Sequence, residues 1–387
     1  MTAREFEFPG FVDVHVHFRD PGAPEAETTA TGLEAARRGG FAAVVTMPNT
    51  TPACDSPELM EYQRRECGRP RTSAPTDSTS STDSTSGTYS TPGTDSTSGT
   101  YSTPGTYSTI QPLLFPSACI SKGRLGKEVA DLEALAAAGA AFFTDDGTYV
   151  GDAKVMEEAM RRAAKLGLVV SQHALAPGLS EADCIRRDLS LCRETGCRLH
   201  VQHISTAEGV ELVRGARKEG LPVTAEATPH HVLLCQDDIK DRNAADAGNF
   251  KMAPPLATAE DRAEVRRAVK DGLLMFATDH APHPAAKKLV GYEKAANGIV
   301  GLETAIAITY RALVEEDGMS VEKWAEAWWK LPREILPSAL VARLDGLKTR
   351  VRAGEERVVD CARFASRSRN CPYGGRAFDC WPVVAAG

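Results

Sequence analysis

Short apolar runs alternate with amphipathic stretches along most of the chain. The apolar runs are rich in β-branched and aromatic residues and end in polar ones, which is typical of buried strands. Between them, apolar residues recur with helical spacing, most clearly over 153–166 and 258–271. The predicted strands are 12–18, 41–48, 113–120, 140–145, 168–173, 199–205, 222–228 and 273–279. Because strands that alternate with helices form parallel sheets, these eight predict an α/β fold, a TIM (β/α)8 barrel.

One segment departs from this pattern. Residues 72–109 contain only Thr, Ser, Asp, Gly, Pro, Tyr and one Ala, and the sequence of 82–93 recurs unchanged at 94–105. Such a tract cannot bury enough apolar surface to offset the entropy of ordering, so we predict a disordered insertion. We therefore expect a barrel over 9–335 that this insertion interrupts, followed by a C-terminal segment at 336–387.

Composition narrows the class of protein. Hydrophobic residues make up 42% and charged residues 25% of the chain, and the net charge is -7. This acidic balance argues against a nucleic-acid or membrane-surface partner and leaves a small-molecule substrate. No apolar run approaches the roughly 18 residues of a membrane span. Because the N-terminus is too polar for a signal peptide, a cytoplasmic location is expected.

Polar residues gather at the carboxyl ends of the predicted strands, which is where barrel enzymes place their active sites. His15 and His17 have i, i+2 spacing, so both side chains leave the same face of one strand and can share a metal ion. A single histidine at such a place is more often part of a solvated strand end. Here, however, eight of the nine histidines fall at or just beyond strand ends. The other polar residues there are Asn49, Asp145, Asp146, His173, His203, His230, His231 and Asp279.

These side chains have the chemistry of a metal centre. Imidazole and carboxylate groups suit zinc or manganese. Four histidines and two aspartates are too many for one tetrahedral ion, but they fit two ions joined by a bridging group. A centre of that kind makes hydroxide from water near neutral pH and polarises a carbonyl group. The residues alone therefore predict a metal-dependent hydrolase.

Seven motifs in order carry a family resemblance. They are PGFVDVHVHFRDPG (9–22), MPNTTP (47–52), FTDDG (143–147), HIST (203–206), TPHH (228–231), ATDHAPH (277–283) and GIVGLET (298–304). Together they resemble the bacterial type I dihydroorotases of the amidohydrolase superfamily, from Pro9 to about Leu347 and more weakly to Trp381. The resemblance implies reversible, zinc-dependent cyclisation of N-carbamoyl-L-aspartate to L-dihydroorotate and water, in de novo pyrimidine (UMP) biosynthesis.

The resemblance also implies a metal site with two Zn2+ ions per subunit. Its ligands would be His15, His17, Asp146, His173, His203 and Asp279. His15 and His17 would hold the first ion, and Asp146 together with a hydroxide would bridge the pair. Many relatives use a carbamylated lysine at the bridging position. Asp279 would be the catalytic residue that takes the proton of the hydroxide and passes it to the leaving nitrogen.

Five further positions would bind the substrate. These are Arg19, Asn49, His283, Asn297 and Gly298. In similar enzymes the first three hold the substrate's carboxylate, and backbone around the last two contacts the ring. Arg19 suits this task on its own chemistry, because a guanidinium group matches a carboxylate in two hydrogen bonds. Ala253 stands where relatives often carry a substrate-contacting Asn.

Other functions stay open on the sequence. Another cyclic amidase, such as a hydantoinase or an allantoinase, is the first alternative, although Arg19 and Asn49 favour a substrate with a carboxylate outside the scissile bond. A dihydroorotase-like scaffold for aspartate transcarbamoylase is a second alternative, but such proteins have typically lost metal histidines. A homodimer is also considered. Only eight residues precede Pro9, so the small β-sandwich that relatives build from their termini is expected to be incomplete, which also fits a truncated gene product.

Overall fold

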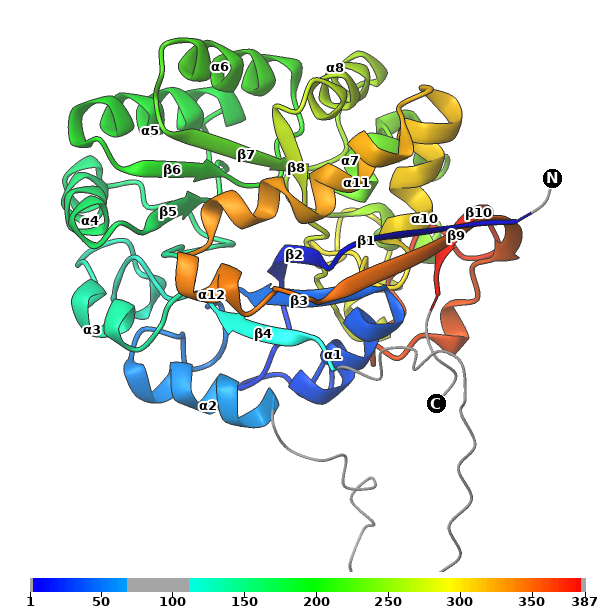
Figure 1. Cartoon of the computed structure of the whole chain (residues 1–387), viewed down its shortest axis with the longest axis horizontal. Coiled ribbons are helices and arrows are strands. Elements are labelled where there is room, and N and C mark those ends of the chain that lie inside the picture. The colour runs from blue at the N-terminus through cyan, green and yellow to red at the C-terminus, as the bar shows by residue number, and fades with distance from the viewer. Residues whose placement is uncertain (1–2, 68–110, 384–387) are drawn as a thin grey trace, which may run out of the picture.

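The computed structural model describes residues 3–67 and 111–383, and the predicted insertion at 72–109 lies outside them. Seven parallel strands form the barrel wall, in the neighbour orders β2-β3-β4 and β5-β6-β7-β8 (Figure 1). They are β2 (Phe11–Val16), β3 (Phe41–Thr46), β4 (Leu113–Pro116), β5 (Val169–Gln172), β6 (Arg198–Val201), β7 (Val223–Ala227) and β8 (Leu274–Phe276). A parallel bridge between Val16 and His280 joins β8 to β2 and closes the ring.

The predicted strand at 140–145 is not a regular strand. Phe143 alone takes its place in the wall, through parallel bridges to Ala118 on one side and Val170 on the other. Just beyond Phe143, Asp145 is buried, and its Oδ1 accepts the backbone N–H groups of Ile120 and Ser121. The eight-stave barrel is therefore confirmed, but its fourth stave consists of isolated bridges.

Helices surround the barrel and bury their apolar faces against it (Figure 1). Helix α4 (Ala153–Leu166) has the predicted bounds, with Asp152 as its N-cap and Gly167 in the left-handed conformation at its end. Helix α8 (Ala259–Lys270) is one residue shorter at each end than predicted. The other α-helices are α1 (Thr29–Arg38), α2 (Pro57–Cys67), α3 (Leu132–Ala137), α5 (Glu181–Thr195), α6 (Ala207–Lys218), α7 (Pro229–Leu233), α9 (Ala285–Lys288), α10 (Ala305–Tyr310), α11 (Val321–Trp329) and α12 (Ser338–Ala342).

Short turns of other helix types complete the connections. They are η1 (Lys122–Arg124), η2 (Gln236–Asp238), η3 (Ala245–Phe250), η4 (Arg311–Glu316), η5 (Leu331–Ile335) and η6 (Cys361–Arg363). Within the described residues, no helix is both long enough and apolar enough to cross a membrane.

Both termini contribute to one small antiparallel sheet beside the barrel (Figure 1). Its order is β1 (Arg4–Pro9), β9 (Lys348–Val358) and β10 (Ala377–Pro382). The ring of Phe8 stacks on Phe11 of the barrel at 5.7 Å and meets Trp324 edge-on at 6.4 Å. In the described residues this unit is a single sheet, as expected of an incomplete sandwich.

Candidate metal centre and substrate pocket

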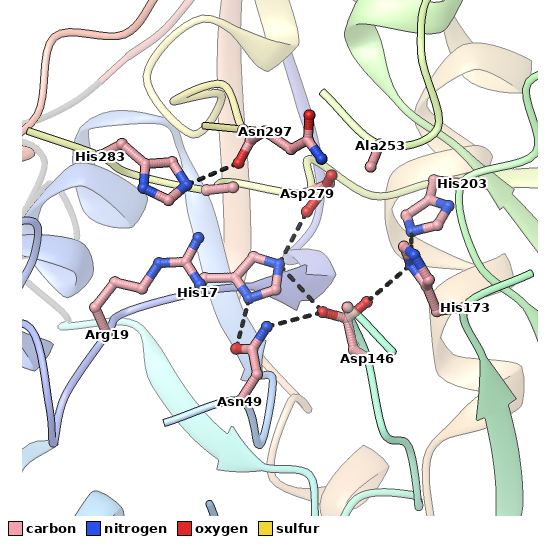
Figure 2. Close-up of a pocket in the computed structure, with 13 residues that line it drawn as sticks. His17, Arg19, Asn49, Asp146, His173, His203, Ala253, Asp279, His283 and Asn297 are labelled. Atoms are coloured by element: carbon pink, nitrogen blue, oxygen red, sulfur yellow. Dashed lines mark hydrogen bonds and ion pairs between the residues drawn. The ribbon is translucent and has the colours of Figure 1, made fainter. Parts of the chain in front are cut away.

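A pocket of about 220 Å³ lies at the carboxyl ends of the barrel strands (Figure 2). Ten of the eleven predicted site residues line it, and the eleventh, His15, is fully buried behind them. The ten are His17, Arg19, Asn49, Asp146, His173, His203, Asp279, His283, Asn297 and Gly298. Ala253 lines the same pocket. The fold thus brings together residues that the sequence spreads over most of the barrel.

Two groups of potential metal ligands share the Asp146 carboxylate. In the first group, the ligand atoms of His15, His17 and Asp146 lie within 4.8 Å of one another. The second group consists of Asp146, His173 and His203, with the same spacing. His173 Nδ1 is 3.6 Å from Asp146 Oδ1 and 3.0 Å from His203 Nε2 (Figure 2). Buried imidazoles on both sides of one carboxylate fit two ions that share a bridging ligand.

The groups around His15 show whether this part of the site favours a bound cation. Its Nδ1–H donates to Glu226 Oε1 at 2.6 Å, which leaves the lone pair on Nε2 facing the cluster. Nε2 is buried and makes no hydrogen bond, although Asp146 Oδ1 is 3.2 Å away and Asp279 Oδ1 is 3.5 Å away. Burial disfavours a charged imidazole, but Asp146 and Glu226 outweigh it and raise the pKa of His15 well above its usual range. The carboxylates therefore favour positive charge here, and a metal ion would supply it.

Two other histidines of the cluster are held neutral. Burial, followed by the charge of Arg19, lowers the pKa of His17. Burial and the neighbouring His173 lower the pKa of His203 to about 3. An uncharged imidazole keeps the lone pair that coordinates a metal, so both groups are ready to bind one at neutral pH.

Asp279 lies beside the first group of ligands, just after β8. Its Oδ1 lies 2.9 Å from His17 Nε2 (Figure 2). Burial opposes ionisation, but the charge of His15 and the neighbouring His17 hold the pKa of Asp279 below its usual range. The carboxylate is therefore ionised at neutral pH, as a metal ligand or a base requires.

Glu226 is a residue that the sequence analysis missed. It lies on β7, accepts hydrogen bonds from His15 Nδ1 and from His200 Nε2 at 3.0 Å, and also accepts the backbone N–H of His203 at 3.3 Å. Burial opposes its ionisation, but the charge and hydrogen bonds of these histidines lower its pKa to about 2. One carboxylate thus orients the ring of one predicted ligand and the backbone of another. An acidic residue inside the otherwise uncharged strand 222–228 was the signal that could have found it.

Two of the histidines outside the predicted ligand set contact other parts of the wall. His280 Nε2 is paired with Glu27 Oε2 at 3.3 Å, and its Nδ1 accepts the backbone N–H of Gly301. His231 bonds Thr228 Oγ1 at 2.8 Å and donates to Pro254 O at 3.1 Å. Neither of them lines the pocket. These contacts fit the packing and orienting roles expected of histidines outside the ligand set.

Arg19 and Asn49 lie at the side of the pocket next to the metal ligands. Arg19 donates from Nε to Pro282 O at 3.4 Å, and burial lowers its pKa. Within the described residues no acceptor pairs with its two terminal nitrogens. Asn49 accepts from His17 Nδ1 at 2.8 Å and donates to Asp146 Oδ2 at 3.2 Å. Asn49 therefore orients two predicted ligands in addition to facing the pocket.

His283, Asn297 and Gly298 line another part of the pocket, and His283 lies on the same side as Arg19 (Figure 2). His283 Nε2–H donates to Asn297 O at 2.7 Å, and burial lowers the pKa of His283 to about 3, with Arg19 as the next cause. Gly298 has a φ of 143°, and a Cβ at this position would lie 2.6 Å from Ala281 O. Only glycine fits so close an approach of two backbones.

Backbone strain is concentrated in the same region. Four non-glycine residues of the described chain have positive φ, and three of them are predicted site residues: Arg19 at 57°, His203 at 31° and Asp279 at 48°. Each such conformation costs roughly 1 kcal/mol or more and persists only where the surroundings impose it. Strain of this kind is typical of functional sites.

Comparisons with known proteins agree with this geometry. A family model described as dihydro-orotase-like matches residues 6–76 and 106–179. The dihydroorotase of Geobacillus sp. (strain WCH70) is 37% identical over 402 residues, which cover 97% of this chain and 84% of that protein. The dihydroorotase of Bacillus caldolyticus is 36% identical over 410 residues, with the same two coverages.

Solved structures share the fold. An L-hydantoinase (dihydropyrimidinase) from Arthrobacter aurescens has a TM-score of 0.77 at 22% identity and covers 98% of this chain and 83% of its own. A dihydroorotase from Saccharomyces cerevisiae, solved with 5-fluoroorotic acid, has a TM-score of 0.72 at 15% identity and covers 98% of both chains. These likenesses confirm the barrel fold, and the sequence identities above show that the chain belongs to the dihydroorotase family.

Proposed function

We propose that this chain is a dihydroorotase that interconverts L-dihydroorotate and N-carbamoyl-L-aspartate at a centre of two zinc ions. The observation that carries the proposal is the pair of ligand groups that share Asp146, next to Arg19, whose terminal nitrogens meet no acceptor among the described residues. His15 and His17 would hold one ion, His173 and His203 the other, and Asp146 both. When bound, the ions would lower the pKa of water and polarise the ring amide carbonyl.

Asp279 would move the proton in this reaction. Its ionised carboxylate lines the pocket beside His17 and can accept a proton from the attacking water. It would then return that proton to the ring nitrogen as the amide bond breaks. In the direction of cyclisation the same group would take the proton from the carbamoyl nitrogen.

Arg19 would select the substrate. Both L-dihydroorotate and N-carbamoyl-L-aspartate carry a carboxylate outside the bond that breaks or forms. The terminal nitrogens of Arg19 can bind it with two parallel hydrogen bonds, with Asn49 and His283 beside them. Asn297 and Gly298 would present backbone groups to the ring. In a chain of net charge -7, such a local cation is needed to attract an anionic substrate.

Because the barrel is also similar to that of a hydantoinase, hydrolysis of hydantoin is a second candidate function. Hydantoin, however, lacks the carboxylate that Arg19 would bind. A homodimer and a complex with aspartate transcarbamoylase stay predictions.

The test combines metal analysis with hydrolysis assays on L-dihydroorotate, hydantoin and allantoin. We expect two zinc ions per chain, a clear preference for L-dihydroorotate, and a kcat that falls about 10²–10⁴-fold in Asp279→Asn. Asp188→Asn is the matched control, because Asp188 is a buried carboxylate on α5 that pairs with Arg187. A wild-type protein that holds two ions but does not hydrolyse L-dihydroorotate would contradict the proposal. Such a result would favour the scaffold alternative.

A further inference from the structure

The C-terminal part of the chain reaches the pocket edge. Between η6 and β10, residues 365–371, here called the rim segment, lie along the loops that follow β2 and β8. The backbone N–H groups of Ala365 and Ser366 donate to the Glu303 carboxylate, and Ser368 Oγ donates to Ala26 O at 2.7 Å. The backbone N–H of Arg367 donates to Glu27 Oε1 at 3.2 Å. The rim segment is thus bonded to several separate parts of the barrel mouth.

Asn370 is the residue of the rim segment that contacts the edge of the pocket. Its side chain is buried, and its Nδ2 donates to Ala281 O at 2.9 Å and to Gly298 O at 3.0 Å. Its Oδ1 accepts the backbone N–H of His283 at 3.2 Å. Its backbone carbonyl accepts the N–H of Val300 at 3.1 Å. The amide group therefore ties the loop after β8 to the loop that carries Gly298.

A second side chain converges on the same carbonyl group. Lys288 of α9 is buried, and its Nζ donates to Gly298 O at 2.8 Å, Ala296 O at 2.7 Å and Lys251 O at 3.0 Å. Gly298 O thus receives one donor from α9 and one from the rim segment. Both donors come from outside the turn that carries Gly298, so they fix where its carbonyl group lies.

We propose that Asn370 is a positioning residue for substrate binding, which sets the relative places of His283 and Gly298 at the carboxylate-binding edge of the pocket. This inference rests on the proposed function, because it assigns these two groups to the substrate. Asn370 makes no hydrogen bond to any of the six predicted metal ligands. Its loss should therefore weaken substrate binding and leave the metal ions in place.

Two substitutions separate the contacts of Asn370. Asn370→Ala removes every side-chain hydrogen bond. Asn370→Asp keeps the acceptor for the His283 N–H but turns an oxygen toward the carbonyl groups of Ala281 and Gly298. Arg367→Ala is the matched control, since the Arg367 side chain is exposed and only its backbone bonds the barrel.

In the full-length, zinc-loaded protein we expect KM for L-dihydroorotate to rise about tenfold or more in both Asn370 variants. The reason is that each variant loses buried hydrogen bonds that hold the substrate-binding groups in place. We expect kcat to change less than about threefold, zinc content to stay at the wild-type value, and Arg367→Ala to match the wild type. A KM within twofold of wild type in a folded Asn370→Ala protein would overturn the proposal. If that variant is not recovered folded, Asn370→Ser is judged by the same criteria.

Amide hydrogen exchange provides a readout that does not need turnover. The His283 N–H should exchange faster in Asn370→Ala but keep its protection in Asn370→Asp, because only the aspartate retains the acceptor. Equal exchange in the two variants would contradict the positioning role. If the wild type does not hydrolyse L-dihydroorotate, the proposed function fails, while this exchange pattern still reports on Asn370.

Discussion

The two sides of the pocket are built in different ways. On the metal side, predicted ligands such as His15 and His173 come from strand ends and are held by neighbouring staves. On the substrate side, His283 and Gly298 lie on loops that Asn370 joins by hydrogen bonds. Asn370 is distant in sequence, 89 positions from Ala281 and 72 from Gly298. The barrel itself therefore positions the groups expected to do the chemistry. The edge expected to recognise substrate depends on the C-terminal segment.

Among the changes that test this difference between the two sides, the largest effect should come from removing the Glu226 carboxylate, which orients ligands of the metal side. Glu226→Gln keeps the volume of Glu226 but replaces one carboxylate oxygen by an NH2 group, which donates hydrogen bonds and does not accept them. The side chain then no longer offers one acceptor oxygen to His15 and another to His200. We expect zinc affinity to fall about 10–100-fold, as for other groups that hold a metal-ligating histidine. Competition with a chelator, followed by metal analysis, measures this change.

Asp188→Asn again serves as the control for Glu226→Gln, because it changes a buried carboxylate away from the pocket. Unchanged zinc affinity in a folded Glu226→Gln protein would mean that β7 does not support the metal side as the geometry indicates.

A smaller effect should follow from changing the cation of the substrate side. Arg19→Lys keeps the positive charge but loses the planar pair of donors. We expect KM for L-dihydroorotate to rise roughly tenfold, because charge-assisted hydrogen bonds of this kind contribute about 1.5–3 kcal/mol each. Zinc content should not change. A loss of zinc in this variant would instead show that the two sides of the pocket are coupled.

The smallest effect should come from deleting residues 72–109 and joining the flanks with a short Gly/Ser linker. None of the predicted ligands or substrate-binding residues lies in this tract. We expect zinc content, kcat and KM to stay within about twofold of wild type. Loss of both ions would show that the tract supports the metal side after all.

Much of the metal side could be predicted from the sequence. The spacing of His15 and His17, and polar residues at strand ends such as Asp146 and Asp279, follow from local pattern and from the geometry of a parallel barrel. Glu226 escaped prediction because its importance comes from the histidines that face it, His15 on β2 and His200 on β6. The fourth stave was predicted as a strand because its residues are apolar, yet it consists of bridges at Phe143, and the Asp145 carboxylate that follows bonds the backbone of Ile120.

The sequence by itself determined the class of fold, the metal-binding chemistry and the family, because hydrophobic period and residue type are local properties. Only the tertiary structure decided how His283 and Gly298 are held at the pocket edge. The role of Asn370 there depends on hydrogen bonds between segments that are far apart in the chain. A hydrogen bond between such segments leaves no periodic trace in the sequence. Its existence depends on how the whole barrel closes and where the C-terminal segment then lies.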